Sequence, residues 1–126
     1  MVKGGGESIL IAEDEGILRK MLKEILQNCG YDVFDADDGE RALRVFHENS
    51  DRIHLLILDV MMPKMNGKEV YIEIKKVNPD IKTIFISGYS SNIIDTMITC
   101  EKKLIFIAKP FIIDEFLAKI RELLDT

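Results

Sequence analysis

The sequence predicts an α/β domain in which helices cover both faces of a parallel sheet. Three observations support this fold class. Five short apolar runs alternate strictly with segments whose apolar residues recur at helical spacing. All of them fit into 126 residues, a common length for one domain. No linker, repeat or low-complexity tract interrupts the alternation. Because parallel strands need crossover connections, this order indicates a single doubly wound sheet.

The first half of the chain contains two strand and helix pairs. Residues 9–12 are all apolar, as in a strand buried on both faces. A helix with a C-cap at Gly30 follows, and its apolar positions are Ile17, Leu18, Met21, Leu22, Ile25 and Leu26. Residues 31–36 are more polar, which favours an edge strand. Asp37, with Glu40 three residues later, is the expected N-cap of the next helix. The inward residues of that helix are Ala42, Leu43 and Phe46.

The second half adds three more pairs. Residues 55–58 form the most apolar strand, and Asn66 with Gly67 starts the next helix. We expect Pro79 to end that helix, whose inward residues are Val70, Ile74 and Val77. Strands follow at 81–86 and 104–108, and between them a helix capped by Ser90 or Ser91 carries Ile93, Ile94, Met97 and Ile98. The last helix has the strongest amphipathic pattern, with Ile113, Phe116, Leu117, Ile120, Leu123 and Leu124.

Composition excludes several classes of function. The chain has 17 basic and 22 acidic residues, so its net charge of −5 gives no overall attraction to nucleic acid or anionic lipid. No apolar run approaches the length of a membrane helix. Cys29 and Cys100 form no metal or redox motif and are expected to be reduced thiols in a cytoplasmic protein. Residues 1–6 are interpreted as a flexible leader or cloning remnant, and residues 7–126 as the domain.

Polar residues follow four of the predicted strands. Ligands of open parallel sheets bind beyond the carboxyl ends of the strands. Glu13 and Asp14 follow the first strand, Asp59 ends the third, Ser87 the fourth and Lys109 the fifth. We therefore expect these side chains to meet at one edge of the sheet.

The acidic members of this set indicate a divalent cation. A nucleotide site would place a glycine-rich loop after the first strand, whereas two carboxylates repel anions. Three converging carboxylates, Glu13, Asp14 and Asp59, would raise one another's pKa values unless a cation neutralised them. Oxygen ligands with open positions suit Mg²⁺.

Lys109 and Ser87 extend this chemistry to phosphate. A lysine can hold a phosphate as a point charge, and a hydroxyl can donate to its oxygens. With Asp59 as nucleophile, the set could accept a phosphoryl group.

Each residue alone also has a plainer reading: Asp59 as a helix cap, Glu13 and Asp14 as a solvated helix start, Ser87 as a turn residue, and Lys109 as a surface residue. Only their shared placement favours a site.

In this order the motifs resemble those of receiver domains of bacterial two-component response regulators. The resemblance covers about residues 7–125. It rests on Glu13-Asp14, Asp59 within Leu58-Asp59-Val60-Met61-Met62-Pro63 followed by Gly67, Ser87-Gly88, Phe106 and Lys109-Pro110-Phe111. It implies a flavodoxin-like (βα)5 fold with strand order 2-1-3-4-5, an order for which a member of this family is a standard example. Ile86-Ser87-Gly88-Tyr89-Ser90 and Asp51-Arg52-Ile53 look most like receivers attached to hybrid sensor histidine kinases.

The resemblance also implies a role for each residue. Asp59 is similar to the phosphoacceptor. The implied ligands of Mg²⁺, which Mn²⁺ could replace, are Glu13, Asp14, Asp59 and the Met61 backbone carbonyl.

On the same resemblance, Lys109 binds the phosphoryl group and is joined to Pro110 by a cis peptide bond. Ser87 and Phe106 are the implied switch residues. Met61 and Tyr89 flank the expected water approach, and we expect them to lengthen the life of the aspartyl phosphate. Glu13 stands where Asp is commoner, and Phe106 where Tyr is frequent.

The expected function is a signalling switch. A sensor histidine kinase or phosphotransfer protein would donate the phosphoryl group. The response would pass to the face made by the fourth helix, the strand at 104–108 and the last helix. We expect a monomer that could dimerise through this face, and a protein that catalyses only its own phosphorylation and slow dephosphorylation. Two alternatives remain: a phosphorylation-independent pseudo-receiver for docking, and a flavodoxin-type cofactor binder, which the acidic pair disfavours.

Overall fold

The computed structural model describes residues 5–88 and 104–125. Five parallel strands form one sheet in the order β2-β1-β3-β4-β5, which is the order that the resemblance implies. The strands are β1 (Ser8–Ala12), β2 (Asp32–Ala36), β3 (Leu55–Asp59), β4 (Lys82–Ser87) and β5 (Leu104–Ala108). The helices are α1 (Gly16–Asn28), α2 (Gly39–Glu48), α3 (Gly67–Val77) and α5 (Ile113–Leu124).

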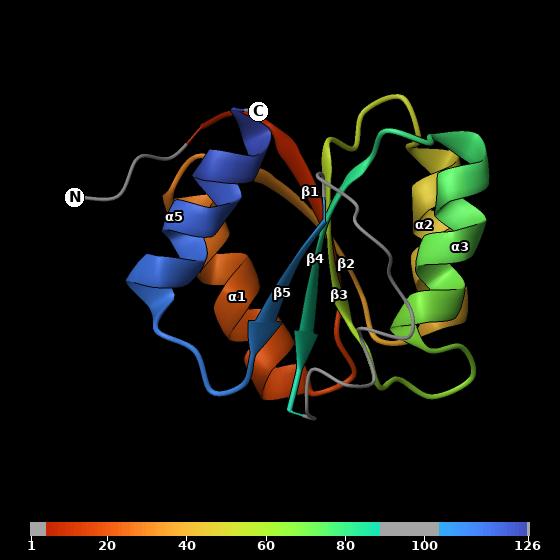
Figure 1. Cartoon of the computed structure of the whole chain (residues 1–126), viewed down its shortest axis with the longest axis horizontal. Helices are drawn as coiled ribbons and strands as arrows, with labels where there is room; N and C mark the ends of the chain where they lie inside the picture. Colours follow the sequence, from red (N-terminus) through yellow and green to blue (C-terminus); the bar gives the residue numbers. More distant parts are fainter. Residues whose placement is uncertain (1–4, 89–103, 126) are drawn as a thin grey trace.

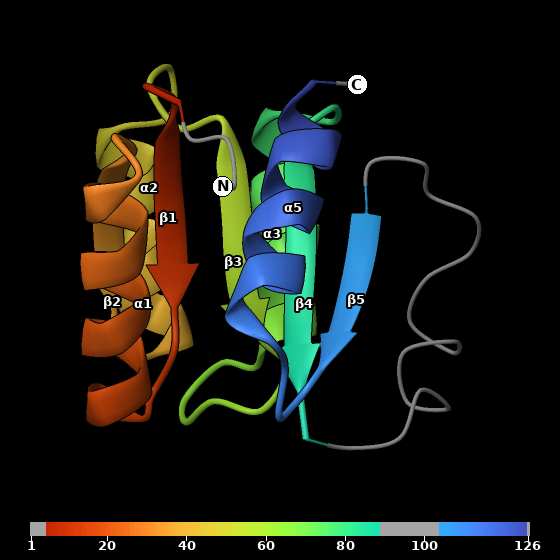
Figure 2. The same cartoon turned by 90° about the vertical axis from the view of Figure 1, so that its left-hand side faces the viewer.

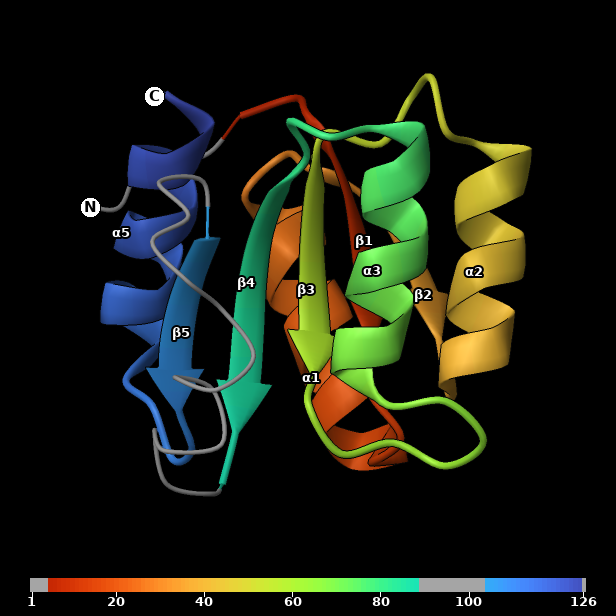
Figure 3. The same ribbon diagram turned by 45° about the vertical axis from the view of Figure 1, so that its right-hand side comes forward.

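The helices lie in two layers, one on each face of the sheet. Helices α1 and α5 cover one face, and α2 and α3 cover the other (Figure 1). The arrowheads of β3, β4 and β5 point to the same edge (Figure 3), and Figure 2 shows α5 lying over the sheet. The predicted fourth helix, from Ser90 or Ser91, falls outside the described residues.

The alternation of side chains along each central strand divides the core into two clusters. Ile9, Ile11, Leu55 and Ile57 belong to the cluster beneath α1 and α5. The residues between them, such as Leu10 and Leu56, belong to the cluster beneath α2 and α3. Since β1 and β3 are buried at every position, the interpretation of their apolar runs is confirmed. The more polar β2 lies at an edge, as expected.

Several local predictions need correction. Asp38, not Asp37, caps α2, because its side chain accepts from the Arg41 amide at 2.8 Å. Val77, predicted to face inward, is 52% exposed at the last position of α3, one turn beyond Ile74, the last buried residue of that helix. Ile17 is 89% exposed, so the apolar stripe of α1 is wider than its buried face. The capping box at Asn66 and Glu69 is present, and it supports the predicted start of α3.

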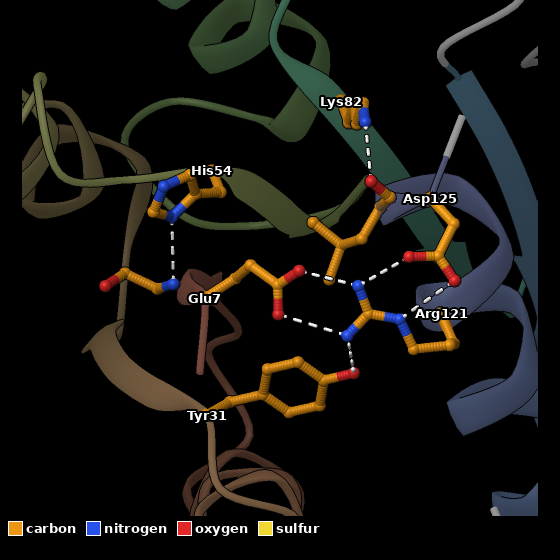
Figure 4. A network of polar contacts seen from close by, with 8 residues as sticks. Glu7, Tyr31, His54, Lys82, Arg121 and Asp125 are labelled. Atoms are coloured by element: carbon orange, nitrogen blue, oxygen red, sulfur yellow. Dashed lines mark hydrogen bonds and ion pairs between the residues drawn. The ribbon is translucent and has the colours of Figure 1, made fainter. Parts of the chain in front are cut away.

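A polar network joins the start of β1 to the end of α5 (Figure 4). The Arg121 guanidinium pairs with both carboxylate oxygens of Glu7, at 3.0 and 2.6 Å, and donates to the Tyr31 hydroxyl at 3.4 Å. It also contacts Asp125 at 2.8 Å, and Lys82 donates to the Leu124 carbonyl. This network lies at the amino ends of the strands, opposite the edge where the site was predicted.

Candidate functional site at the carboxyl edge of the sheet

The fold brings the predicted site residues to one edge. Register pairs Ala12 of β1 with Leu58 of β3, and Ser87 of β4 with Ala108 of β5. Glu13 directly follows Ala12, and Lys109 directly follows Ala108. The order of the strands therefore places side chains that are far apart in the sequence next to one another.

A buried charge cluster forms the centre of the site. Glu13 is 1% exposed and Asp59 is 6% exposed. The Lys109 ammonium lies 3.0 Å from Glu13 Oε1 and 3.4 Å from Asp59 Oδ2. The second oxygen of Asp59 accepts from the Met61 amide at 3.3 Å. One lysine thus faces two buried carboxylates, which leaves their negative charge only partly balanced.

This imbalance appears in the pKa values. Burial and then the facing Asp59 carboxylate raise the pKa of Glu13 to about 7. Burial also raises the pKa of Asp59, although Glu13 and Lys109 oppose that effect. Burial by itself would lower the pKa of Lys109, but its contacts with Glu13 and Asp59 outweigh burial and raise it. The carboxylates therefore compete for a proton when no other cation is present.

The arrangement fits a hard divalent cation. Glu13, Asp14 and Asp59 each offer one carboxylate oxygen, and these three atoms lie within 4.8 Å of one another. Asp14 is exposed, which leaves room for water on that side. Within the described part of the chain, no hydrogen bond reaches the buried Glu13 Oε1. An all-oxygen donor set with one open side is the chemistry that Mg²⁺ prefers.

Backbone contacts position the nucleophile candidate. The Gly67 amide donates to the Val60 carbonyl at 2.9 Å, which draws the start of α3 against the end of β3. A Cβ atom at position 67 would collide with the Asp59 carbonyl oxygen. The loop after Asp59 therefore closes tightly because this position lacks a side chain.

The backbone of Lys109 is fixed on two sides. Its amide donates to the Ser87 carbonyl at 2.8 Å, and its peptide bond to Pro110 is cis, as the resemblance implies. The hydrogen bond to Ser87 holds the residue beside the end of β4. The lysine side chain can thus reach the carboxylates after β1 and β3.

The remaining predicted residues lie around this centre. Ser87 is 1% exposed at the end of β4, and Met61 is 50% exposed beyond β3. Phe106 is half-buried on β5 and packs against the cluster beneath α2 and α3. Tyr89 and Cys100 lie outside the described residues. Cys29 follows the last residue of α1, at the end of the helix far from this edge.

Arg19 was not predicted to belong to the site. Its guanidinium Nη1 donates to the Glu13 backbone carbonyl at 2.8 Å. Its Nε lies 3.3 Å from Asp35, which also pairs with Lys23 at 3.1 Å. Basic residues on an exposed helix face are common, so nothing in the sequence distinguishes Arg19 from its neighbours.

An apolar surface lies beside the charged cluster. A groove of about 490 Å³ is lined by Leu18, Met21, Lys109, Pro110, Phe111 and Ile113. Ile17 and Ile112 are also largely exposed. Large exposed apolar side chains that border a charged site are typical of surfaces that bind other proteins.

The fold is of the flavodoxin-like class, and its carboxyl edge carries clustered acids that face one lysine. Comparison with known families gives the particular assignment. Residues 9–121 match the response regulator receiver domain, and the chain belongs to that family.

Two curated relatives are much longer than this chain. The chain is 33% identical, over 96% of its length, to the sensor kinase CckA of Brucella abortus, of which it covers 13%. It is 37% identical, over 94% of its length, to the probable transcriptional regulator ycf27 of Porphyridium aerugineum, of which it covers 48%. It thus spans half or less of the length of these two relatives.

A solved structure gives the same result. The structure of the response regulator TrrA from Thermotoga maritima, in complex with Mg²⁺ and BeF, aligns with a TM-score of 0.77 and 36% identity. The alignment covers 93% of this chain and 98% of TrrA. No helix among the described residues is long and apolar enough to cross a membrane.

Proposed function

We propose that this receiver domain accepts a phosphoryl group on Asp59 from a phosphohistidine, in a cytoplasmic two-component phosphorelay. The observation that carries the proposal is the buried Asp59 carboxylate, which faces both Lys109 and a second buried acid at the ligand edge of the sheet. A structural aspartate has no need of this arrangement, because it leaves two carboxylates competing for one lysine.

The side chains suggest how the transfer proceeds. An Asp59 oxygen attacks phosphorus, the bond between phosphorus and the imidazole nitrogen breaks, and the imidazole leaves with its electron pair and takes up a proton. Lys109 lies close enough to both acids to follow the phosphoryl oxygens when they replace Asp59 Oδ2 as its partner. The domain thereby catalyses its own phosphorylation and acts on no metabolite.

The metal ligands would be the clustered carboxylates of Glu13, Asp14 and Asp59. The family resemblance adds the Met61 backbone carbonyl. Mg²⁺, or Mn²⁺ in its place, would neutralise the charge that gathers on the phosphoryl oxygens. This role is supported by the clustered donor oxygens, and by the Mg²⁺ and BeF complex of the related TrrA protein.

The donor would be a sensor histidine kinase or a phosphotransfer protein. The relation to a sensor kinase supports this partner class, and the groove beside Lys109 offers an apolar surface next to the reacting groups. Ser87 and Phe106 would then pass the phosphorylated state to the face around β5 and α5. The output partner would bind there, or a second copy of the chain would.

Intact mass measurement with a small phosphodonor tests the proposal. Incubation with acetyl phosphate and Mg²⁺ should add one phosphoryl group, and Asp59→Asn should prevent the addition. Asp32→Asn is the matched control, because Asp32 is an exposed acid at the opposite end of the sheet. If the wild type gains no mass, the chain would instead be a phosphorylation-independent docking module. If Asp59→Asn gains the mass equally, Asp59 is not the phosphoacceptor and the proposal fails.

A further inference from the structure

Each polar group of Glu13 lies against a different neighbour. The Glu13 amide donates to the Ala36 carbonyl at 3.1 Å. Its Oε2 accepts from the Glu15 amide at 3.1 Å, and its Oε1 faces Lys109. The fourth group, its backbone carbonyl, accepts from Arg19. The orientation of the acid therefore depends on a side chain that lies on the next helix.

Arg19 holds two elements at once. Its Nη1 reaches the loop after β1, while its Nε pairs with Asp35 on β2. Asp35 directly precedes Ala36, whose carbonyl receives the Glu13 amide. The planar guanidinium thus links the start of α1 to both the end of β2 and the Glu13 loop, which are themselves joined by a backbone hydrogen bond. A lysine has a single nitrogen and cannot make both contacts with this geometry.

We propose that Arg19 is a positioning residue that holds Glu13 and Asp14 in the geometry needed to bind a divalent cation. It touches neither the cation nor the reacting atoms, and it acts through the Glu13 backbone carbonyl. This inference rests on the proposed function, since it assigns Arg19 a role at the same metal site.

Lys23 provides a matched control on the same helix. It lies one turn further along α1 and pairs with the same Asp35 carboxylate, but among the described residues it forms no hydrogen bond or ion pair with Glu13. Lys23→Ala removes an ion pair of the same kind without releasing the Glu13 loop. A difference between the Arg19 and Lys23 variants therefore reports on the loop contact and not on the lost ion pair.

The experiment measures Mg²⁺ affinity in the unphosphorylated protein by NMR titration, and then the phosphorylation rate over a range of Mg²⁺ concentrations. Arg19→Ala and Arg19→Lys should each weaken Mg²⁺ binding about tenfold, the lower end of the range for residues that orient metal ligands. Lys23→Ala should stay within about twofold of wild type. At saturating Mg²⁺, the Arg19 variants should recover the wild-type phosphorylation rate, since Asp59 and Lys109 are untouched.

Two results would overturn the inference in different ways. If the wild type binds Mg²⁺ and the Arg19 variants bind it as tightly as Lys23→Ala does, Arg19 has no positioning role and the proposed function stands. If the wild type itself binds no Mg²⁺ and is not phosphorylated, the proposed function fails and this inference fails with it.

Discussion

Replacing Gly67 with alanine should lower the stability of the protein and disturb Asp59. Gly67 and Gly16 are both the first residue of a helix, at α3 and α1, and both φ angles lie outside the left-handed region. A Cβ at position 67 would collide with the Asp59 carbonyl oxygen and lie only 3.0 Å from the Asp59 carbonyl carbon and 3.1 Å from Val60 Cα. A Cβ at position 16 would meet only the tip of the Arg19 side chain, at 3.9 Å.

The expected magnitude follows from the atoms that must move. All three atoms near a Cβ at position 67 are backbone at the end of a buried strand, so they cannot yield by a simple rotation. Overpacking of this kind costs about 1–3 kcal/mol. For a domain of this size that corresponds to a fall in Tm of roughly 3–12 °C. Gly16→Ala should instead be neutral, or more stable by up to about 0.5–1 kcal/mol, because alanine is the better helix residue.

Urea unfolding of both variants, followed by circular dichroism, measures these differences. The phosphorylation rate with acetyl phosphate gives a second readout, since the strand end that must shift in Gly67→Ala carries Asp59. The reasoning is refuted if Gly67→Ala is as stable as Gly16→Ala and is phosphorylated at the wild-type rate.

Three further predictions concern charge and access at the site and the opposite edge. Glu13→Gln should raise the free energy of unfolding of the metal-free protein at pH 8 by about 1–2 kcal/mol, and should abolish the stabilisation by Mg²⁺ in urea titrations. The reason is that the folded state keeps the Glu13 proton up to about pH 7, so wild-type stability falls as pH rises from the unfolded value of 4.5 through 7. Arg121→Ala should cost about 1–2 kcal/mol at pH 7. Hydrogen bonding to Arg121 lowers the pKa of Glu7 below 4.5, so the loss of stability in Arg121→Ala should shrink as pH falls through that lowered value. Equal losses at pH 7 and pH 3 would contradict this prediction. Met61→Asn combined with Tyr89→Ala should shorten the life of the aspartyl phosphate about tenfold, because the two changes admit and orient water. Intact mass measured over time follows the loss of the phosphorylated form. An unchanged rate of loss would exclude obstruction by these side chains.

The sequence predicted the strands better than the details of the helices. Apolar runs such as residues 55–58 identify buried strands because every position faces one of the two helix layers. The spacing of apolar residues on α1 is helical, but Ile17 and Met21 lie outside the core because the sheet covers only part of the helix surface. The cap of α2 was misplaced by one residue, since Asp37 and Asp38 are chemically equivalent in the sequence.

The site itself was predictable only as far as strand ends determine it. Glu13, Asp59 and Lys109 follow strands, so the parallel sheet brings them together. Arg19 and Gly67 belong to helix starts, and their contacts depend on how each helix packs against a particular loop. The spacing of apolar residues does not predict contacts between a helix start and a loop. The sequence analysis therefore missed Arg19 and used Gly67 only as a helix start and as part of the family motif.

The cost of the charge cluster connects the fold to the proposed function. Buried carboxylates facing one lysine make the metal-free protein less stable at neutral pH than an apolar edge would. The strands that carry them are apolar on both faces, and this packing supplies the stability that the cluster costs. A divalent cation would remove most of the repulsion, and a phosphoryl group on Asp59 would then add negative charge beside Lys109. Because the Lys109 amide donates to the Ser87 carbonyl, a rearrangement of Lys109 around that charge would be passed to β4 and β5. We therefore expect the phosphorylated state to alter the β5 side of the sheet more than the β2 side, and amide exchange measured with and without phosphorylation would test this difference directly.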